Sequence, residues 1–309
     1  MGVCRLGTAG WSYKDWDTVF YPPGTRAGEY LSIYAERFNI VEVDSTYYRI
    51  PAKRTVQGWF DRTPDDFRFA VKMPGLITHE KVLERCEADR NEFLDAIAPL
   101  DHKLHSILLQ FGYFNKAAFA SAKPFMDRLD RFLAAFPQPR SLAVEIRNKN
   151  WLNDEFLQLL RSHGAALALA DQVWMPPIEQ VLDKHDCITG DFLYVRLIGD
   201  RHGIEKITTT WDKVVVDRRE RIASLVTALA GVISAADVVT FINNHYAGHA
   251  PASCDEFLAA MAMVASGQVH ARKKETVRDP SSEPAAPAKK ATVRRKADGA
   301  DSRRGKRGG

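Results

Sequence analysis

The chain has 309 residues, of which 45% are hydrophobic and 27% charged, so it is long enough for one large or two ordinary globular domains. Residues 270–309 contain 13 of the 43 Lys/Arg residues and 5 of the 39 Asp/Glu residues. Residues 1–269 therefore contain 30 Lys/Arg and 34 Asp/Glu. The net charge of +4 therefore comes from a basic tail on a mildly acidic body, which excludes a uniformly basic protein.

Features that mark secreted or membrane proteins are missing from the sequence. Cys4, Cys86, Cys187 and Cys254 are scattered without a C-x-x-C pair, which argues against a disulfide framework or a cysteine zinc site. The beginning, MGVCRLGTAGW, has neither the basic n-region nor the apolar h-region of a signal peptide. The most apolar long stretch, 222–242, contains polar residues and divides into a helix and a strand. We expect a cytoplasmic protein without membrane contact.

Eight short apolar runs of strand length recur along the chain. The second opens the stretch 38–51 with the β-branched run Ile40, Val41 and Val43 and then turns polar, as a buried strand does when it ends at a site. Alternation along this strand places Glu42, Asp44 and Thr46 on one face. In chain order, the predicted strands lie at 5–8, within 38–51, and at 67–72, 106–110, 142–147, 165–171, 192–197 and 238–244.

Segments long enough for a helix separate most of these runs. The segment 153–163 has an Asn cap and an acidic first turn, and Pro124 is expected to kink or restart the segment 117–136. The other predicted helices lie at 28–37, 53–62, 88–100, 176–186, 212–236 and 254–266. This order predicts a single-domain TIM-like (β/α)8 barrel over residues 1–269. A doubly wound open sheet is the alternative, but no G-x-G-x-x-G turn follows the first strand.

Carboxylates at three strand ends are the first catalytic candidates. A barrel would bring Glu42, Glu145 and Asp171 round one opening, where two carboxylates with different pKa values suit general acid/base chemistry on a glycosidic or similar bond. The alternative is that each carboxylate balances a neighbouring cation. His245, after the last strand, is the fourth candidate, and its alternative is a structural hydrogen bond.

Cations, amides and aromatic rings at the other strand ends suit ligand binding. Lys72, Arg147 and Arg196 could hold an anion, and a lysine in a barrel also has the chemistry of a Schiff base. The aromatic residues could stack on a sugar or a base, or pack within their own loops. The remaining ligand-binding candidates are Trp11, Tyr13, Tyr47, His79, Gln110, Trp151, Asn243 and Asn244. No H-E-x-x-H motif is present, and the sequence predicts no metal site and assigns no cofactor.

Several of these segments resemble the YecE-like family, also called domain of unknown function 72. The motifs occur in the same order: GTAGWSY with FYP, VEVDSTYY, FRFAVKMP with ITHE, LLQF, VEIRNKNW and NNHYAG. The resemblance runs from about residue 5 to 265 and implies a TIM-barrel-like fold, but the family has no established activity and so implies no reaction. Three positions depart from the family pattern: Ala9 replaces the usual Ser, Asp44 a common Asn, and Asn148 a frequent His, which removes one proton carrier.

Residues 270–309 are rich in Ala, Pro, Ser, Lys and Arg and have almost no large apolar side chains. Such a segment buries too little surface to offset the entropy of ordering, so we expect a disordered tail. The Lys/Arg clusters of residues 272–309 suit non-specific contacts with nucleic-acid phosphates. The alternative is a solubilising extension without a partner.

These observations favour a barrel with a charged pocket at the carboxyl ends of its strands. We expect an acid/base enzyme of hydrolase type that acts on a small polar or anionic ligand. Two alternatives stay open, because barrels host many functions. One is a nucleic-acid-processing protein that uses the basic tail, and the other is a non-catalytic ligand-binding barrel.

Overall fold

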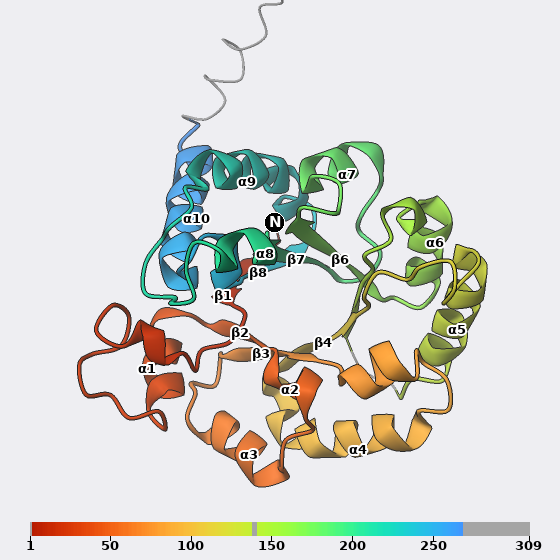
Figure 1. Cartoon of the computed structure of the whole chain (residues 1–309), viewed down its shortest axis with the longest axis horizontal. Helices are drawn as coiled ribbons and strands as arrows, with labels where there is room; N and C mark the ends of the chain where they lie inside the picture. Colours follow the sequence, from red (N-terminus) through yellow and green to blue (C-terminus); the bar gives the residue numbers. More distant parts are fainter. Residues whose placement is uncertain (1, 138–140, 268–309) are drawn as a thin grey trace, which may run out of the picture. The chain divides into compact units, whose positions relative to one another are not determined.

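Eight parallel strands form the wall of a nearly closed barrel (Figure 1). The structure is a computed structural model and describes residues 2–137 and 141–267. Each strand from β2 to β7 pairs in parallel with the next, and β8 pairs with β1. The strands are β1 (Cys4–Thr8), β2 (Ile40–Val43), β3 (Arg68–Lys72), β4 (Leu104–Gln110), β5 (Leu142–Glu145), β6 (Ala166–Gln172), β7 (Phe192–Gly199) and β8 (Asp237–Ile242). The predicted (β/α)8 barrel is confirmed, and the open doubly wound sheet is excluded.

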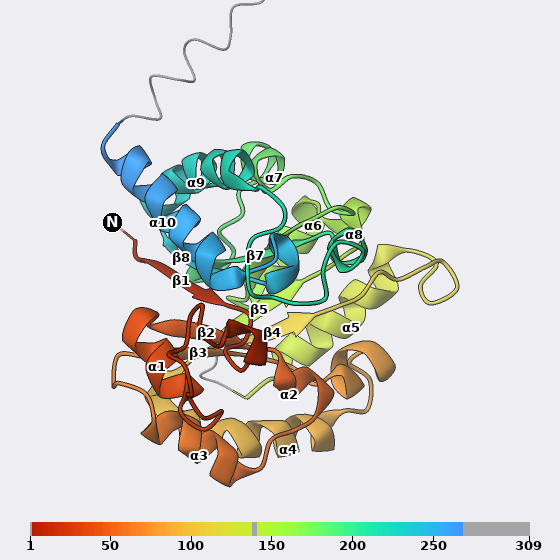
Figure 2. The same ribbon diagram turned by 60° about the vertical axis from the view of Figure 1, so that its left-hand side comes forward.

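Helices form a layer outside these strands (Figure 1). Figure 2 shows α1, α3 and α4 beside β2 and β3, while α9 and α10 lie on the side of β8 and β1. The helices are α1 (Tyr30–Arg37), α3 (Lys53–Asp61), α4 (Glu87–Ile97), α5 (Ala122–Ala134), α6 (Asp154–Ser162), α7 (Ile178–Lys184), α9 (Arg219–Ile233) and α10 (Ala250–Ala265), with the short α2 (Ser45–Tyr48) and α8 (Arg201–Glu205) after β2 and β7. The predicted Asn cap is confirmed, because Asn153 Oδ1 accepts a hydrogen bond from Phe156 N at 3.0 Å.

The polar run after β2 is a helical turn and not a continuation of the strand. Thr46 Oγ1 donates to Val43 O at 2.9 Å and lies 2.7 Å from Lys72 O, which ties this turn to the ends of β2 and β3. The predicted alternation of Glu42, Asp44 and Thr46 is therefore wrong beyond Val43. The buried Thr46 side chain supports the strand ends and does not face the barrel mouth.

Two other predicted helices begin later than expected. The segment predicted at 117–136 becomes helical only at Ala122, so Pro124 lies in the first turn, where its missing N–H costs nothing. The segment predicted at 212–236 becomes helical at Arg219, and the short helix α8 was not predicted.

Small and large side chains complement each other inside the barrel. Alanines line the interior from β3, β5 and β6, whereas β7 and β8 contribute large aromatic rings, with Tyr194 and Phe241 centroids 5.0 Å apart. Filling one side with rings and the other with methyl groups closes the interior without a pore. This interior cluster consists of Ile40, Ala70, Leu108, Ala143, Ala166, Ala168, Phe192, Tyr194, Val239 and Phe241.

The junction between β1 and β2 differs from the other seven. Only one parallel bridge joins the strands, between Ala9 and Glu42. Below it the Tyr34 hydroxyl from α1 enters the wall, since Thr8 N donates to Tyr34 Oη at 2.9 Å and Tyr34 Oη lies 3.1 Å from Ile40 O. The two backbones still approach closely, because a Cβ on Gly7 would lie 2.1 Å from Ile40 O. A side-chain hydroxyl thus replaces strand-to-strand hydrogen bonds below the bridge, whereas at the bridge itself Gly10 N still donates to Glu42 O at 2.8 Å.

None of the helices within residues 2–137 and 141–267 is long and apolar enough to cross a membrane. The predictions made for the tail, namely its boundary at residue 270, its disorder and its nucleic-acid contacts, lie outside the described residues. The cytoplasmic location stays a prediction.

Candidate functional site

A layer of polar side chains covers the apolar interior at the carboxyl ends of the strands. Its members each lie two residues beyond an interior residue of the same strand, so strand alternation points them into the barrel mouth. They are Glu42 after Ile40, Lys72 after Ala70, Gln110 after Leu108, Glu145 after Ala143 and Arg196 after Tyr194. All five were predicted as site residues, and the structure brings them together.

Arg196 joins the two predicted carboxylates of β2 and β5. Its Nε and Nη2 donate to Glu42 Oε2 and Oε1 at 2.8 and 2.7 Å, and its Nη1 donates to Glu145 Oε2 at 2.7 Å. Tyr194 Oη donates to Glu42 Oε2 at 2.6 Å, and Arg147 Nε donates to Glu145 Oε1 at 3.0 Å. Every carboxylate oxygen of this buried network is bonded, so neither glutamate is free to contact a ligand.

The surroundings of the two glutamates shift their pKa values in opposite directions. Burial, followed by the Asp44 carboxylate, raises the pKa of Glu42. Burial also acts to raise the pKa of Glu145, but the guanidinium groups of Arg196 and Arg147 together outweigh it and lower that pKa. Glu145 is therefore firmly ionised at neutral pH and fixes both arginines.

Lys72 is the cation in this layer that makes no hydrogen bond to Glu42 or Glu145. Its Nζ lies 3.6 Å from Asp44 Oδ1 and 4.5 Å from the centroid of the Tyr47 ring, with 11% of the side chain exposed. Among the described residues no acceptor lies within hydrogen-bond distance of this ammonium. Burial, followed by the charge of Arg196, lowers its pKa.

His79 stands beside this lysine on one turn of π-helix, Leu76–Glu80. Its ring packs edge-on against Tyr47 with centroids 5.1 Å apart, and its Nδ1 lies 2.9 Å from Thr78 Oγ1. Burial, followed by the positive charges of Lys72 and Arg147, lowers the pKa of His79 below its usual 6.5. The imidazole is therefore neutral at neutral pH.

Backbone strain follows directly after this π-helical turn. Val82, Leu83 and Arg85 have φ angles of 44°, 66° and 50°, in the left-handed region that side chains disfavour. Rare π-turns and strained backbone both concentrate at functional sites, so this segment supports a role for His79.

Asp171 does not join Glu42 and Glu145. In the register of β6 and β7, Ala170 lies opposite Arg196, so Ala170 occupies the inward position and Asp171 faces the helices. Its carboxylate accepts from Arg221 Nη2 at 2.9 Å and from Tyr246 Oη at 3.0 Å. The expected convergence of three carboxylates is therefore wrong, because the predicted strand end was one residue out of phase with the mouth.

His245 lies at the β8 edge of the same face, with both ring nitrogens engaged. Its Nδ1 is 2.6 Å from Asn243 Oδ1 and its Nε2 is 3.1 Å from Glu205 Oε1. The ring also packs on Trp211, with centroids 4.6 Å apart. Burial lowers its pKa against the opposing effect of Glu205. These contacts match the structural alternative more closely than proton transfer.

Two predicted amides make internal hydrogen bonds. Asn244 Oδ1 accepts from Trp16 Nε1 at 3.2 Å and from Ala250 N at 2.9 Å, so Asn244 connects the loop after β1 to the start of α10. Gln110 Nε2 donates to Phe111 O at 2.6 Å. Asn244 is therefore a loop anchor, whereas Gln110 still contributes to the floor of the mouth.

The predicted aromatic residues divide between the mouth and loop packing. Tyr13 Oη donates to Ala9 O at 2.7 Å, and burial, followed by the charges of Asp44 and Glu42, raises its pKa. Trp11 packs edge-on against Trp59 at 5.6 Å, and Trp151 stacks on Phe125 at 5.4 Å. Tyr13 and Tyr47 thus border the mouth, while Trp11 and Trp151 pack within loops.

A second part of the site is a groove next to Arg147, which was not predicted from the sequence. The groove has a volume of about 500 Å³ and is lined by Gly112, Tyr113, Arg147, Lys149, Gln172 and Trp174. Tyr113 and Trp174 are 72% and 74% exposed. Aromatic residues in the loops after neighbouring strands were the sequence signal for this groove. Trp174 lies just before the segment 176–186, and no clear periodicity in this part of the chain indicated its position.

Within residues 2–137 and 141–267, no group of three or more His, Cys, Asp or Glu side chains is arranged to hold a metal ion. The ionised groups of the mouth instead pair with one another.

The family described as "Protein of unknown function DUF72" matches residues 5–278. The chain belongs to the DUF72 family. Two curated relatives are similar to it over part of their length. The UPF0759 protein YecE of Escherichia coli (strain K12) is 32% identical over 144 residues, which cover 46% of this chain and 48% of YecE. The UPF0759 protein YunF of Bacillus subtilis (strain 168) is 28% identical over 173 residues, which cover 54% and 60%. The chain thus spans about half the length of the curated relatives it matches.

Two solved DUF72 structures share the barrel. The protein from Thermotoga maritima MSB8 is 27% identical, with a TM-score of 0.66 and coverage of 84% of this chain and 99% of that protein. The protein from Enterococcus faecalis V583 is 23% identical, with a TM-score of 0.66 and coverage of 84% and 96%. These comparisons confirm the family and the fold that the sequence motifs implied.

Proposed function

We propose that this DUF72 protein is an acid/base enzyme of hydrolase type that acts on a small anionic ligand at the barrel mouth. The observation that carries the proposal is the Lys72 ammonium, which is largely buried and has no hydrogen-bond acceptor among the described residues. A buried cation normally has hydrogen-bond acceptors, so one that has only Asp44 at 3.6 Å and the Tyr47 ring beside it is suited to an incoming anion.

The buried network prepares the same position for negative charge. Arg147 uses only its Nε on Glu145, so within the described residues its two terminal nitrogens are free for an anion. Arg196, held between Glu42 and Glu145, contributes a fixed positive charge beneath Lys72. Because these donors are already in place, binding and charge stabilisation require little rearrangement.

His79 and Lys72 are assigned the proton transfers in this proposal. The Thr78 hydroxyl lies 3.3 Å from Pro74 O, to which it donates, so it accepts from His79 Nδ1–H and leaves Nε2 as a free acceptor. A neutral imidazole of this tautomer can take a proton from the attacking water. The ammonium of Lys72, with its lowered pKa, then protonates the leaving group. Glu42 and Glu145 position the arginines rather than transferring protons.

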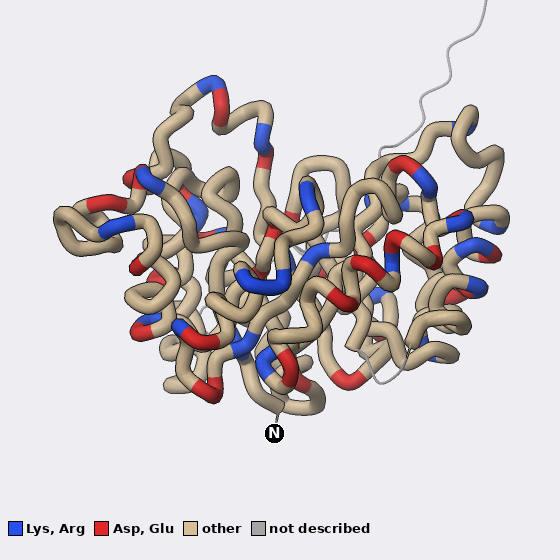
Figure 3. Tube along the Cα trace, turned by 90° about the horizontal axis from the view of Figure 1, so that it is seen from below, with Lys and Arg blue, Asp and Glu red and all other residues tan. Residues whose placement is uncertain are grey.

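Charge over the rest of the barrel does not select for anions. Figure 3 shows Lys/Arg and Asp/Glu interspersed along the trace. Affinity for an anion therefore depends on the local donors at the mouth, and substitution of a single donor is expected to have a large effect.

The test uses the full-length chain, thermal unfolding in inorganic phosphate, and hydrolysis of 4-nitrophenyl phosphate. We expect phosphate to raise the melting temperature of the native chain by mass action and to have little effect on Lys72→Met. Lys72→Arg, which keeps the charge but not the titration, should retain the stabilisation and lose turnover. His79→Gln should likewise bind phosphate but not hydrolyse the ester.

Three results would contradict the proposal. Stabilisation by phosphate that persists in Lys72→Met would place the anion elsewhere. Binding through Lys72 without turnover of any ester would support the non-catalytic ligand-binding barrel. Turnover that survives His79→Gln would remove His79 as the base.

A further inference from the structure

The groove beside Arg147 combines two exposed aromatic rings with two cations. Tyr113 follows β4, Arg147 and Lys149 follow β5, and Trp174 follows β6, so three neighbouring loops contribute to it. Its volume of about 500 Å³ falls within the range of about 300 to 1,000 Å³ that is usual for pockets that hold small ligands. It opens next to the proposed anion position, because Arg147 belongs to both.

Contacts between the loops hold these side chains in place without a ligand. Asn148, between the two cations, accepts from Phe114 N and donates to Phe114 O, both at 2.8 Å, and so joins the loop of Tyr113 to that of Arg147. The Asn148 amide thus has a structural role here.

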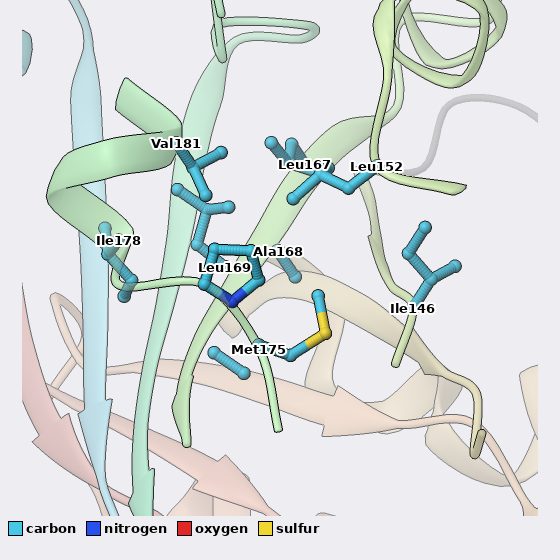
Figure 4. Close-up of a pocket in the computed structure, with 10 residues that line it drawn as sticks. Ile146, Leu152, Leu167, Ala168, Leu169, Met175, Ile178 and Val181 are labelled. Carbon is cyan, nitrogen blue, oxygen red and sulfur yellow. The ribbon is translucent and has the colours of Figure 1, made fainter. Parts of the chain in front are cut away.

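The loop of Trp174 is anchored from below. Met175 and Pro176, the next two residues, enter an apolar space between β6 and α7 whose free volume is only about 10 Å³, about enough for one water molecule. Figure 4 shows Met175 in this space close to Leu169 and Ala168. Trp174 is therefore exposed on a packed loop rather than on a loose one.

The recognition groups of the groove have few partners within the protein. Among the described residues, neither Tyr113 nor Trp174 packs against another aromatic ring, although both line the same groove. Lys149 makes no ion pair in the described part of the chain, and Gln172 Nε2 is buried without an acceptor there. Two open ring faces, two cations and one amide donor match a ligand that is planar at one end and anionic at the other.

We propose that the groove binds the ring of a nucleoside monophosphate whose phosphate lies at Arg147, Lys149 and Lys72. This inference rests on the proposed function, since it places the anion at the same cations. The base stacks against Trp174 and Tyr113, and Gln172 donates to an acceptor on the ligand. The guanidinium of Arg147 holds the phosphate through its two terminal nitrogens.

The test measures tryptophan fluorescence of the full-length chain during titration with AMP, adenosine, ribose 5-phosphate and inorganic phosphate. Stacking of adenine on the exposed Trp174 should quench its emission, and AMP should bind roughly tenfold more tightly than ribose 5-phosphate. Trp174→Ala should reduce AMP affinity to that of ribose 5-phosphate and leave the phosphate affinity unchanged, as followed by calorimetry. Trp211→Phe, at the opposite β7–β8 side of the mouth, is the matched control and should change neither quenching nor affinity.

The outcomes separate this inference from the proposed function. Equal binding of AMP and ribose 5-phosphate, unaffected by Trp174→Ala, would refute the ring site while leaving the anion site intact. The phosphate assignment would be refuted if adenosine bound as tightly as AMP and Arg147→Gln changed the affinity for neither ligand. Failure of phosphate, ribose 5-phosphate and AMP to bind the native chain would refute the inference together with the proposed function.

Discussion

Replacing Arg196 by methionine tests the central network most directly. The substitution removes the bonds to Glu42 and Glu145 and leaves two buried carboxylates facing an apolar side chain. Breaking a buried ion pair from one side costs about 3–5 kcal/mol. For a body of this size, each kcal/mol lowers the melting temperature by about 2 °C, so Arg196→Met should melt about 6–10 °C below the native chain.

The pH dependence of this loss identifies its cause. In the native chain the pKa of Glu145 is lowered, so its stabilising contribution is present above the unfolded value of 4.5 and is lost as pH falls through the folded pKa. Without Arg196, burial should raise the pKa of Glu145 above the unfolded value and raise further the pKa of Glu42, which is already raised in the native chain. The folded variant then holds extra protons, and its unfolding free energy falls as pH rises. The difference between variant and native chain should therefore be smaller at about pH 5 than at about pH 8.

Urea unfolding followed by circular dichroism at both pH values measures these differences. A triple variant with Glu42→Gln, Glu145→Gln and Arg196→Met should recover most of the loss, since neither buried carboxylate remains. Arg221→Met is the matched control, because Arg221 also joins two carboxylates but is partly exposed, and it should cost about 1 kcal/mol. A loss for Arg196→Met that is equal to the control, or independent of pH, would refute the buried-network argument.

Three further substitutions test other parts of the structure. Tyr34→Phe removes the partner of the Thr8 amide and should lower the unfolding free energy by about 1–3 kcal/mol in urea titration; an unchanged value would contradict the hydroxyl-bridged seam. Because the pKa of Lys72 is lowered in the folded state, the folded chain releases this proton at a lower pH than the unfolded chain, and the unfolding free energy should rise with pH below 10.5. Lys72→Met should abolish this rise. A native chain without the rise would contradict the lowered pKa. Asn153→Ala should cost about 1 kcal/mol through loss of the cap, whereas Asn153→Asp, which keeps the acceptor, should cost little; equal losses would exclude the cap as the cause.

Periodicity along the chain was sufficient to predict the barrel. Buried parallel strands appear as short apolar runs, and the crossover helices appear as longer segments between them, so the order of elements follows from local composition. The errors occur where side-chain contacts override local preference. Thr46 bonds two strand ends and turns the chain after Val43, and no local pattern encodes its bond to Lys72.

The site was predictable in part for a related reason. Polar residues at strand ends identified Glu42, Lys72, Gln110, Glu145 and Arg196, but the phase of each strand decides which neighbour faces the mouth. Asp171 was assigned to the mouth because it is the charged residue at the end of β6, but the positions in phase with the interior are alanines, and Ala170 lies opposite Arg196. The role of Trp174 depends on how its loop is anchored, which only the packing of Met175 and Pro176 reveals.

The seam between β1 and β2 has a consequence for how the barrel assembles. Seven junctions join strand to strand through their backbones, whereas the eighth has a single bridge, between Ala9 and Glu42, and otherwise depends on a hydroxyl from α1. A chain with α1 undocked therefore keeps only that one bridge between β1 and β2, and the rest of both strand edges is unpaired. Such edges pair readily with other chains. We expect self-association during refolding to begin at these two strands, and the docking of α1 to be the step that ends it.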